Sequence, residues 1–305
     1  MVNVRKLLKK INISSEILFD EPMSNHTSFK VGGPADAFAE PADTLELIKL
    51  INICRENNIP LFILGGGANI VVSDRGIRGL VISTTRLCAI NIKNNTVECQ
   101  AGISMEELVL KTTEKGLGGI EDFAWMPGSL GGSIRMNARC YNTSISDVLE
   151  SVIWLDMTTG RTKTYIKNPS DFAYKISPFQ KGDKLILQAK LALHYNDKNI
   201  LKKRIEEIKQ DREKKGHFFA PSAGSVFKNN RDFGQPTGVL IDNLGLKGYS
   251  IGDAQVSPFH GNIIINRGQA KAEDIKRLIE YLQEQVYNAY GFTIEPEVIF
   301  AGDWD

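Results

Sequence analysis

The chain has 305 residues, of which 42% are hydrophobic and 24% are charged. This composition is typical of a soluble globular protein and excludes a chain that is mainly disordered or fibrous. The length exceeds what one compact domain usually needs and indicates two domains. Lys and Arg number 37 against 36 Asp and Glu, so the net charge is +1 and no global field attracts a nucleic acid or an anionic membrane surface. An anionic ligand must therefore bind at a local site.

The four cysteines are scattered along the chain, with no CxxC pair and no Cys/His cluster at zinc-ligand spacing. We therefore expect reduced thiols, no metal site and a cytoplasmic protein. The first twenty residues include Lys and Arg but never form the continuous apolar stretch of a signal peptide. No window of 18 apolar residues occurs either, so we expect neither export nor membrane insertion.

The first part of the chain predicts short strands interrupted by two helices. Asp43, followed by Glu46, begins a helix over 43–58, and Ser104 begins another that ends at Gly116. Strands are expected on both sides of the three glycines in PLFILGGGANIVVSD (60–74), and at 80–83 and 96–101.

The second part begins with a predicted hairpin at 151–166 and an alternating strand at 184–195. Residues 197–215 predict a charged surface helix with a narrow apolar stripe, and we place the domain boundary there. The elements expected beyond it are a loop at 216–224, a strand around Val226, a helix near 236–244, a strand at 262–266, a helix over 272–290 ended by Gly291, and a strand at 293–300. Together these elements indicate an α+β fold.

Two glycine-rich segments are the strongest chemical signal: GGGAN at 65–69 and PGSLGGS at 127–133. Glycine tolerates positive φ and leaves backbone N–H groups accessible, which suits close approach to a phosphate. Neither segment has P-loop spacing, and the first lacks GxGxxG at the start of a helix. Tight turns are the alternative explanation for either segment, but two in one domain favour an anion site.

Several polar residues are candidates for chemistry, each with a plainer alternative. Ser225 lies in PSAGSVFKN, which is not a GxSxG elbow, so it acts either in catalysis or as a turn cap. Glu297 in IEPEVIF is either a partly buried carboxylate or a solvated one. Lys175 and Arg212 bind an anion or are ordinary surface residues. Chemistry alone predicts a phosphate-containing ligand between two domains.

Seven collinear segments give a more specific indication. They are NHTSFKVGGPA (25–35), LGGGANIVVSD (64–74), MPGSLGGSIRMNA (126–138), FAYKISPFQ (172–180), PSAGSVFKN (221–229), QVSPFHGNIIIN (255–266) and EPEV (295–298). In order and spacing the chain resembles the UDP-N-acetylenolpyruvoylglucosamine reductases, flavoproteins that make UDP-N-acetylmuramate for peptidoglycan. The passage from the fourth segment directly to the last domain resembles the shorter subclass, which lacks a substrate-capping insertion.

The resemblance implies a two-lobed FAD-binding domain of the vanillyl-alcohol-oxidase (PCMH) type over 1–196, with lobes of about 1–85 and 86–196. An α+β substrate-binding domain would cover 197–305. FAD is the implied cofactor and NADPH the reducing co-substrate. The residues implied to bind FAD are Gly65, Gly66, Gly67, Ala68, Asn69, Pro127, Gly128, Ser129, Gly131, Gly132, Ser133 and Asn137.

The implied reaction has two halves. NADPH reduces the flavin and leaves, and the flavin N5 hydride then passes to the enolpyruvyl β-carbon of the substrate. Ser225 matches the family's proton donor, Glu297 matches the assisting carboxylic residue, and Lys175 occupies the position of a family Arg. The residues implied to hold the substrate are Arg212 and Lys215 at the diphosphate, with Tyr174, Lys228 and Asn229 lining the same pocket. The implied partner is a small UDP-sugar, with no nucleic acid or membrane, and the protein is expected to be a monomer.

Two departures from the family pattern leave an alternative function open. Lys175 offers a point charge where Arg offers a planar fork. Arg139 and Asn142 stand where the family usually has glycines, and Arg139 carries a steric cost if its position requires positive φ. One hypothesis is that Arg139 supplies the guanidinium missing at 175. The alternative function is an FAD-binding paralogue with lost or altered reductase activity, but the survival of Ser225 and Glu297 favours the enzyme.

Overall fold

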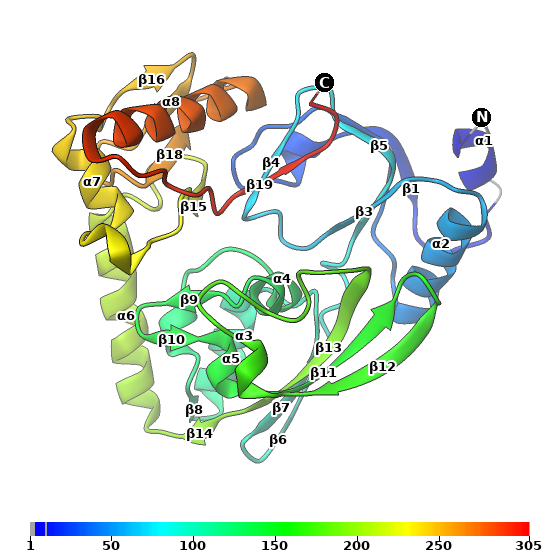
Figure 1. The fold of residues 1–305 in the computed structure, drawn as a ribbon. Coiled ribbons are helices and arrows are strands. Elements are labelled where there is room, and N and C mark those ends of the chain that lie inside the picture. Colours follow the sequence, from blue (N-terminus) through cyan, green and yellow to red (C-terminus); the bar gives the residue numbers. More distant parts are fainter. Residues whose placement is uncertain (1–3, 10, 305) are drawn as a thin grey trace. The chain divides into compact units, whose positions relative to one another are not determined.

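The computed structural model describes residues 4–9 and 11–304 (Figure 1). Residues 1–3, 10 and 305, which the predicted domains also include, lie outside the described residues. The chain divides into two compact units. The first unit comprises Met1–Phe19, Ala37–Gly66 and Gly79–Lys209, and the second comprises Asp20–Asp36, Gly67–Arg78 and Gln210–Asp305. Both units are therefore assembled from segments that are distant in sequence.

The first unit contains a five-stranded antiparallel sheet of order β12-β11-β13-β7-β6. The predicted hairpin and the alternating strand are confirmed as its three neighbouring strands β11, β12 and β13. The strand bounds are β6 Ile90–Lys93, β7 Thr96–Gln100, β11 Leu149–Asp156, β12 Arg161–Ile166 and β13 Lys184–Ala192. One apolar core includes Val97, Val152 and Leu191 from this sheet.

Capping residues begin the two predicted helices of this unit. Asp43 accepts a hydrogen bond from the Glu46 N–H (2.8 Å) at the start of α2 (Thr44–Glu56), and Ser104 accepts one from the Glu107 N–H (3.1 Å) at α3 (Met105–Glu114). A second apolar core includes Leu47, Leu50 and Ile51 of α2. A four-stranded sheet has the order β1-β2-β5-β3, with bounds β1 Ile17–Pro22, β2 Pro34–Ala39, β3 Leu61–Leu64 and β5 Ile77–Ser83.

Shorter elements carry several of the candidate residues. A hairpin joins β9 (Arg139–Cys140) to β10 (Thr143–Ser144), and helix α6 (Lys198–Lys214) follows the pair formed by β8 and β14. The glycine-rich segment at 127–133 contains the first residues of the short helix α4. The remaining bounds are α1 Val4–Leu8, β8 Leu117–Gly118, η2 Glu121–Phe123, α4 Leu130–Arg135, α5 Ile145–Val148, η3 Pro169–Asp171 and β14 His194–Tyr195.

The second unit is built on an antiparallel sheet of order β15-β18-β17-β16, with α8 (Ala272–Tyr290) packed against β16 and β17. Helix α8 has the predicted bounds, and Gly291 ends it with φ +78°. A parallel pair joins β4 (Ile70–Val72) to β19 (Ile299–Ala301). The remaining bounds are η1 Met23–Asn25, β15 Ser222–Ser225, η4 Arg231–Phe233, α7 Thr237–Asn243, β16 Ser250–Ile251, β17 Ala254–Val256 and β18 Ile263–Asn266.

The predicted strand at 293–300 is wrong over most of its length, because only β19 at 299–301 forms there. Pro296 has no N–H to donate, and the segment before β19 makes an isolated bridge to Phe227 instead of a ladder. Glu297 therefore lies two residues ahead of the strand.

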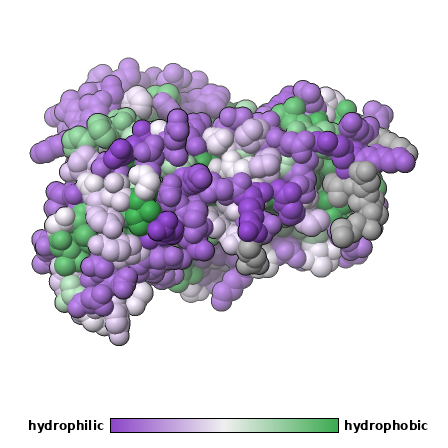
Figure 2. Space-filling model, turned by 90° about the horizontal axis from the view of Figure 1, so that it is seen from above, coloured by the Kyte–Doolittle hydropathy of each residue, from purple (hydrophilic) through white to green (hydrophobic). Residues whose placement is uncertain are grey.

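Hydrophilic residues predominate on the face of the molecule seen in Figure 2, where hydrophobic residues form smaller areas between them. Among residues 4–9 and 11–304, no helix combines the length and the apolar character needed to cross a membrane.

Candidate active site

The glycine segments at 65–66 and 128–129 approach each other closely within the first unit. A Cβ atom on Gly66 would lie 2.6 Å from the Gly128 Cα, and one on Gly65 would lie 2.6 Å from the Ser129 Oγ. Gly66 has no room for a side chain because its neighbours are backbone atoms, so the close approach there requires glycine, whereas a side chain at Gly65 would displace the Ser129 hydroxyl. Gly128 also has φ +112°. This cradle of bare backbone fits the pyrophosphate of a dinucleotide, which needs N–H groups without side chains in front of them.

Most N–H groups of the second glycine segment are occupied within the protein. The Leu130 and Gly131 N–H groups donate to the Ile103 and Ala101 carbonyls at 2.9 and 2.7 Å. Those of Gly132 and Ser133 donate to the Ser129 Oγ and carbonyl. Since Pro127 has no N–H, Gly128 and Ser129 are the residues of this segment whose backbone N–H groups remain candidates for an anion. Gly131 serves the packing, because a Cβ there would lie 2.9 Å from the Ala101 Cβ.

Asn137 fixes the turn that carries Tyr174 and Lys175. It is buried and has φ +41°, and its Nδ2 donates to the Ala173 carbonyl at 2.7 Å. Ala173 and Ile176 pair with each other, so the tip of the turn is Tyr174 and Lys175. Lys175 has φ +57°, and its Nζ lies 6.0 Å from the centroid of the Tyr174 ring. The structure thus brings three of the predicted residues together.

Ser225 and Glu297 are neighbours in the second unit. Ser225 is the last residue of β15, and the Glu297 N–H donates to the carbonyl of the following residue, Val226, at 2.7 Å. Asn69 holds the other side of Glu297, since its Nδ2 donates to the Glu297 carbonyl (3.1 Å) and its carbonyl accepts from the Ile299 N–H (3.0 Å). The side chain of Asn69 is therefore directed to the segment just before β19, which carries Glu297.

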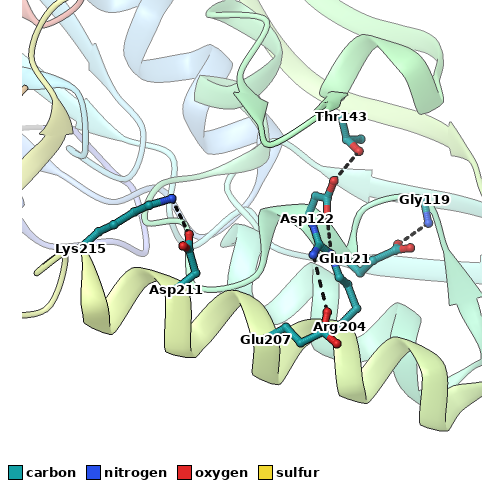
Figure 3. A network of polar contacts seen from close by, with 8 residues as sticks. All are labelled: Gly119, Glu121, Asp122, Thr143, Arg204, Glu207, Asp211 and Lys215. Atoms are coloured by element: carbon teal, nitrogen blue, oxygen red, sulfur yellow. Dashed lines mark hydrogen bonds and ion pairs between the residues drawn. The ribbon is translucent and has the colours of Figure 1, made fainter. Parts of the chain in front are cut away.

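Basic groups gather at the C-terminal end of helix α6 and just beyond it. Arg212 is buried, and Lys215 pairs with Asp211 at 2.7 Å (Figure 3). Burial, together with the charges of Arg212, His260 and Lys215, lowers the pKa of His217 to about 4. Burial and the charge of Lys215 also lower the pKa of His260. The histidines are thus uncharged near neutral pH among cations, an environment that favours an anionic ligand.

These two histidines were missed as site residues, because in the sequence all four histidines are widely separated. One available signal was the position of His260 inside the family-like segment 255–266. For His217 the signal was its place two residues after Lys215.

Lys228 and Asn229 are both engaged within the second unit. Lys228 forms an ion pair with Glu295, and its carbonyl accepts from the Thr237 Oγ1 at 2.8 Å. The Asn229 Oδ1 accepts from the Thr237 N–H at 2.9 Å, at the start of α7. The two residues lie close to Ser225 in sequence, but these contacts also give them a structural role.

The condition for a steric cost at Arg139, a positive φ at that position, is not met. Arg139 is exposed in β9, opposite Ser144, and the residue with positive φ is Tyr141 at +51°. The reason is the hairpin register: Cys140 pairs with Thr143, so the two turn residues are 141 and 142, and the turn places the unusual dihedral on the first of them.

The predicted site residues divide between the two units. The first contains 65, 66, 127–133, 137, 174 and 175, and the second contains 67–69, 212, 215, 225, 228, 229 and 297. The Arg139 hypothesis and the roles of the individual residues stay predictions.

Comparisons with known proteins identify the family. A family model described as an FAD binding domain matches residues 35–165, and one described as the C-terminal domain of UDP-N-acetylenolpyruvoylglucosamine reductase matches 214–301. The enzyme of that name from Treponema denticola is 45% identical over 94% of each chain, and that from Borreliella burgdorferi is 39% identical over 98% of each.

Among solved structures, the UDP-N-acetylenolpyruvylglucosamine reductase (MurB) of Thermus caldophilus matches with a TM-score of 0.79 at 30% identity, covering 94% of this chain and 99% of that one. The predicted fold class, an α+β protein with a PCMH-type FAD-binding domain and a C-terminal domain, is confirmed. The chain belongs to the UDP-N-acetylenolpyruvoylglucosamine reductase family.

Proposed function

We propose that this chain reduces UDP-N-acetylenolpyruvoylglucosamine to UDP-N-acetylmuramate, in peptidoglycan precursor synthesis, with Ser225 as the proton donor. The observation that carries the proposal is the bond from the Glu297 N–H to the carbonyl of Val226, the residue next to Ser225. The chain is an FAD-dependent oxidoreductase that uses NADPH as reductant, and no comparison favours a paralogue without reductase activity.

When bound, FAD supplies hydride transfer from NADPH to the enolpyruvyl double bond. The chain's part is to hold the cofactor with the backbone of Gly65–Asn69, Gly128 and Ser129, and at Asn137. The Gly66 and Gly128 backbones support this assignment because their contact leaves no room for a Cβ. Gly131, Gly132 and Ser133 support the cradle from behind through the bonds that fix α4.

Addition of hydride to the substrate's β-carbon leaves negative charge on its α-carbon and carboxylate. A serine hydroxyl is a weak acid, so it protonates only a strongly basic carbon, and it needs a fixed position to do so. Strand β15 and the Val226–Glu297 bond provide that position for Ser225. We assign Lys175 to the substrate carboxylate as a cationic stabiliser and Glu297 to the same region.

The basic group at the C-terminal end of α6 suits the substrate's diphosphate. Arg212 and Lys215 are the proposed ligands, with His217 and His260 beside them. Tyr174, Lys228 and Asn229 would line the pocket around the rest of the UDP-sugar. We further propose an FAD domain over 1–196, a substrate domain over 197–305, a monomeric state, and a cytoplasmic location, which agrees with four free cysteines.

The test is an anaerobic visible spectrum of the purified protein, recorded before NADPH, after NADPH and after the substrate. Bleaching of an oxidised flavin by NADPH and its return on adding substrate support the proposal. Bleaching without return would contradict it. In the Ser225→Ala variant we expect bleaching as in the wild type and almost no return, whereas loss of both half-reactions would argue against a specific proton-donor role.

A further inference from the structure

Helix α6 carries two cations that lie over two aromatic rings of the first unit. The Arg204 Cζ is 5.0 Å from the centroid of the Tyr141 ring, and the Lys209 Nζ is 5.3 Å from that of Trp125. Both aromatic residues have left-handed backbones, with φ +51° at Tyr141 and +61° at Trp125. The same helix therefore contacts two residues in a conformation that bulky side chains rarely adopt.

Such residues persist only where their surroundings hold them. Tyr141 is the first residue of the two-residue turn between β9 and β10, a position where a positive φ usually selects glycine. The turn itself therefore does not stabilise a tyrosine at this position. The support for this conformation comes from outside the hairpin, and the guanidinium over the ring is one such support.

A hydrogen-bonded bridge fixes the position of Arg204 (Figure 3). Its Nε and Nη2 both donate to the Asp122 Oδ1, at 2.9 and 2.8 Å, and the Thr143 Oγ1 donates to the Asp122 Oδ2 at 2.8 Å. The Asp122 side chain is only 14% exposed. The Asp122 carboxylate of the 3-10 helix η2 thus links helix α6 to strand β10, and both of its oxygens accept hydrogen bonds.

Trp125 and Tyr141 flank residues 126–140, the segment that the proposed function assigns to FAD binding. Residues 126–140 include Gly128, Ser129 and Asn137, and the Met126 Sδ and Cys140 Sγ atoms lie 3.4 Å apart, so the two ends of the segment meet. We propose that Arg204 and Lys209 are positioning residues, which hold Tyr141 and Trp125 and so preorganise residues 126–140 for FAD. This inference rests on the proposed function, because that proposal assigns the segment to FAD.

Preorganisation predicts an effect on cofactor affinity in protein that remains folded. An Arg204→Met variant keeps the aliphatic stem and loses the guanidinium. We expect it to raise the FAD dissociation constant about ten-fold, and Lys209→Met to raise it about three-fold, because the Lys–Trp contact has no carboxylate bridge. Lys203→Met is the matched control, since Lys203 is an exposed cation on the same helix, and we expect no change.

The measurement is quenching of flavin fluorescence as FAD is added to apoprotein, at a temperature well below the unfolding midpoint of every variant. A purely structural role would lower the apoprotein's midpoint and leave the FAD dissociation constant unchanged, and that result would overturn the inference. Unchanged midpoints with weakened FAD binding support it.

A double-mutant cycle identifies the partner of Arg204. In a Tyr141→Gly background the unusual φ has no steric cost and the ring is gone, so Arg204→Met should weaken FAD binding by less than in the wild-type background. Equal losses in both backgrounds would contradict a role through Tyr141. The cycle uses FAD alone, so it remains valid if substrate turnover fails. Conversely, normal FAD affinity in all variants with intact turnover would overturn this inference and leave the proposed function standing.

Discussion

The most informative single residue of the site is Lys175, at the tip of a turn held by Asn137. A cation near a developing carboxylate charge acts mainly in the transition state. We expect Lys175→Ala to slow flavin reoxidation by substrate about 10²- to 10³-fold and to leave flavin reduction by NADPH unchanged. The measurement is anaerobic stopped-flow absorbance of each half-reaction.

The conservative variant separates charge from geometry at this position. Lys175→Arg restores the residue usual in the family. The steric cost of the left-handed backbone, with φ +57° at this position, is the same for Arg and Lys. A reoxidation rate within about ten-fold of the wild type is expected, since either cation balances a carboxylate. An equal loss in both variants would show that the site needs the shape of lysine and would refute a purely electrostatic role.

His217 predicts a pH dependence of stability. Its pKa is about 4 in the folded protein and about 6.5 in an unfolded chain. As the pH falls from 6.5 to 4, the unfolded state binds a proton that the folded state does not, so folding stability falls over this window and is unaffected by this group above it. His217→Asn should therefore lose less stability than the wild type between pH 7 and pH 4, as measured by the shift of the unfolding midpoint. Parallel curves for the two proteins would contradict the assignment.

At the scale of elements, capping residues and glycines in the sequence predicted the helix ends that depend on contacts between residues close in sequence. Helices α2 and α3 begin at the expected residues, because the Asp43 and Ser104 side chains accept free N–H groups three positions on. Helix α8 ends at the expected Gly291, whose N–H donates to the Tyr287 carbonyl. Helix α4 and strand β19 were not predicted within their bounds. The first is too short to show a period, and the second exists only because it pairs with β4, more than 200 residues earlier.

Asp74 shows how a distant residue can cap a helix. Its Oδ1 and Oδ2 accept the Ala272 and Glu273 N–H groups at 2.9 and 3.1 Å, so a residue that follows the first glycine segment (65–69) caps helix α8. Asp74→Ala should lower the free energy of unfolding by about 1 kcal/mol, the usual value of an N-cap. The check is urea denaturation, with Glu280→Ala on the exposed side of α8 as a control expected to change little. A loss no larger than the control's would show that the two bonds are not stabilising.

At the scale of the whole chain, the sequence did not predict which segments make up each of the two units. Residues 67–78 group with residues 210–305 because β4 pairs with β19 and because Asp74 caps α8, and no local pattern records either contact. The candidate residues, by contrast, could be proposed from the segments that resemble the family, because the order of those segments along the chain is visible without knowing which strands pair.

Asn69 connects these scales, because it ends the glycine loop and also holds the carbonyl of Glu297, 228 positions away. Asn69→Ala removes that bond but keeps the backbone pairing of Asn69 with Ile299. We expect FAD content and flavin reduction by NADPH to be preserved and reoxidation by substrate to slow about ten-fold or more, because Glu297 and the neighbouring Ser225 lose a fixed position. Loss of FAD with no effect on reoxidation in the remaining holoprotein would instead assign the Asn69 side chain to the cofactor, the role that the family resemblance implies.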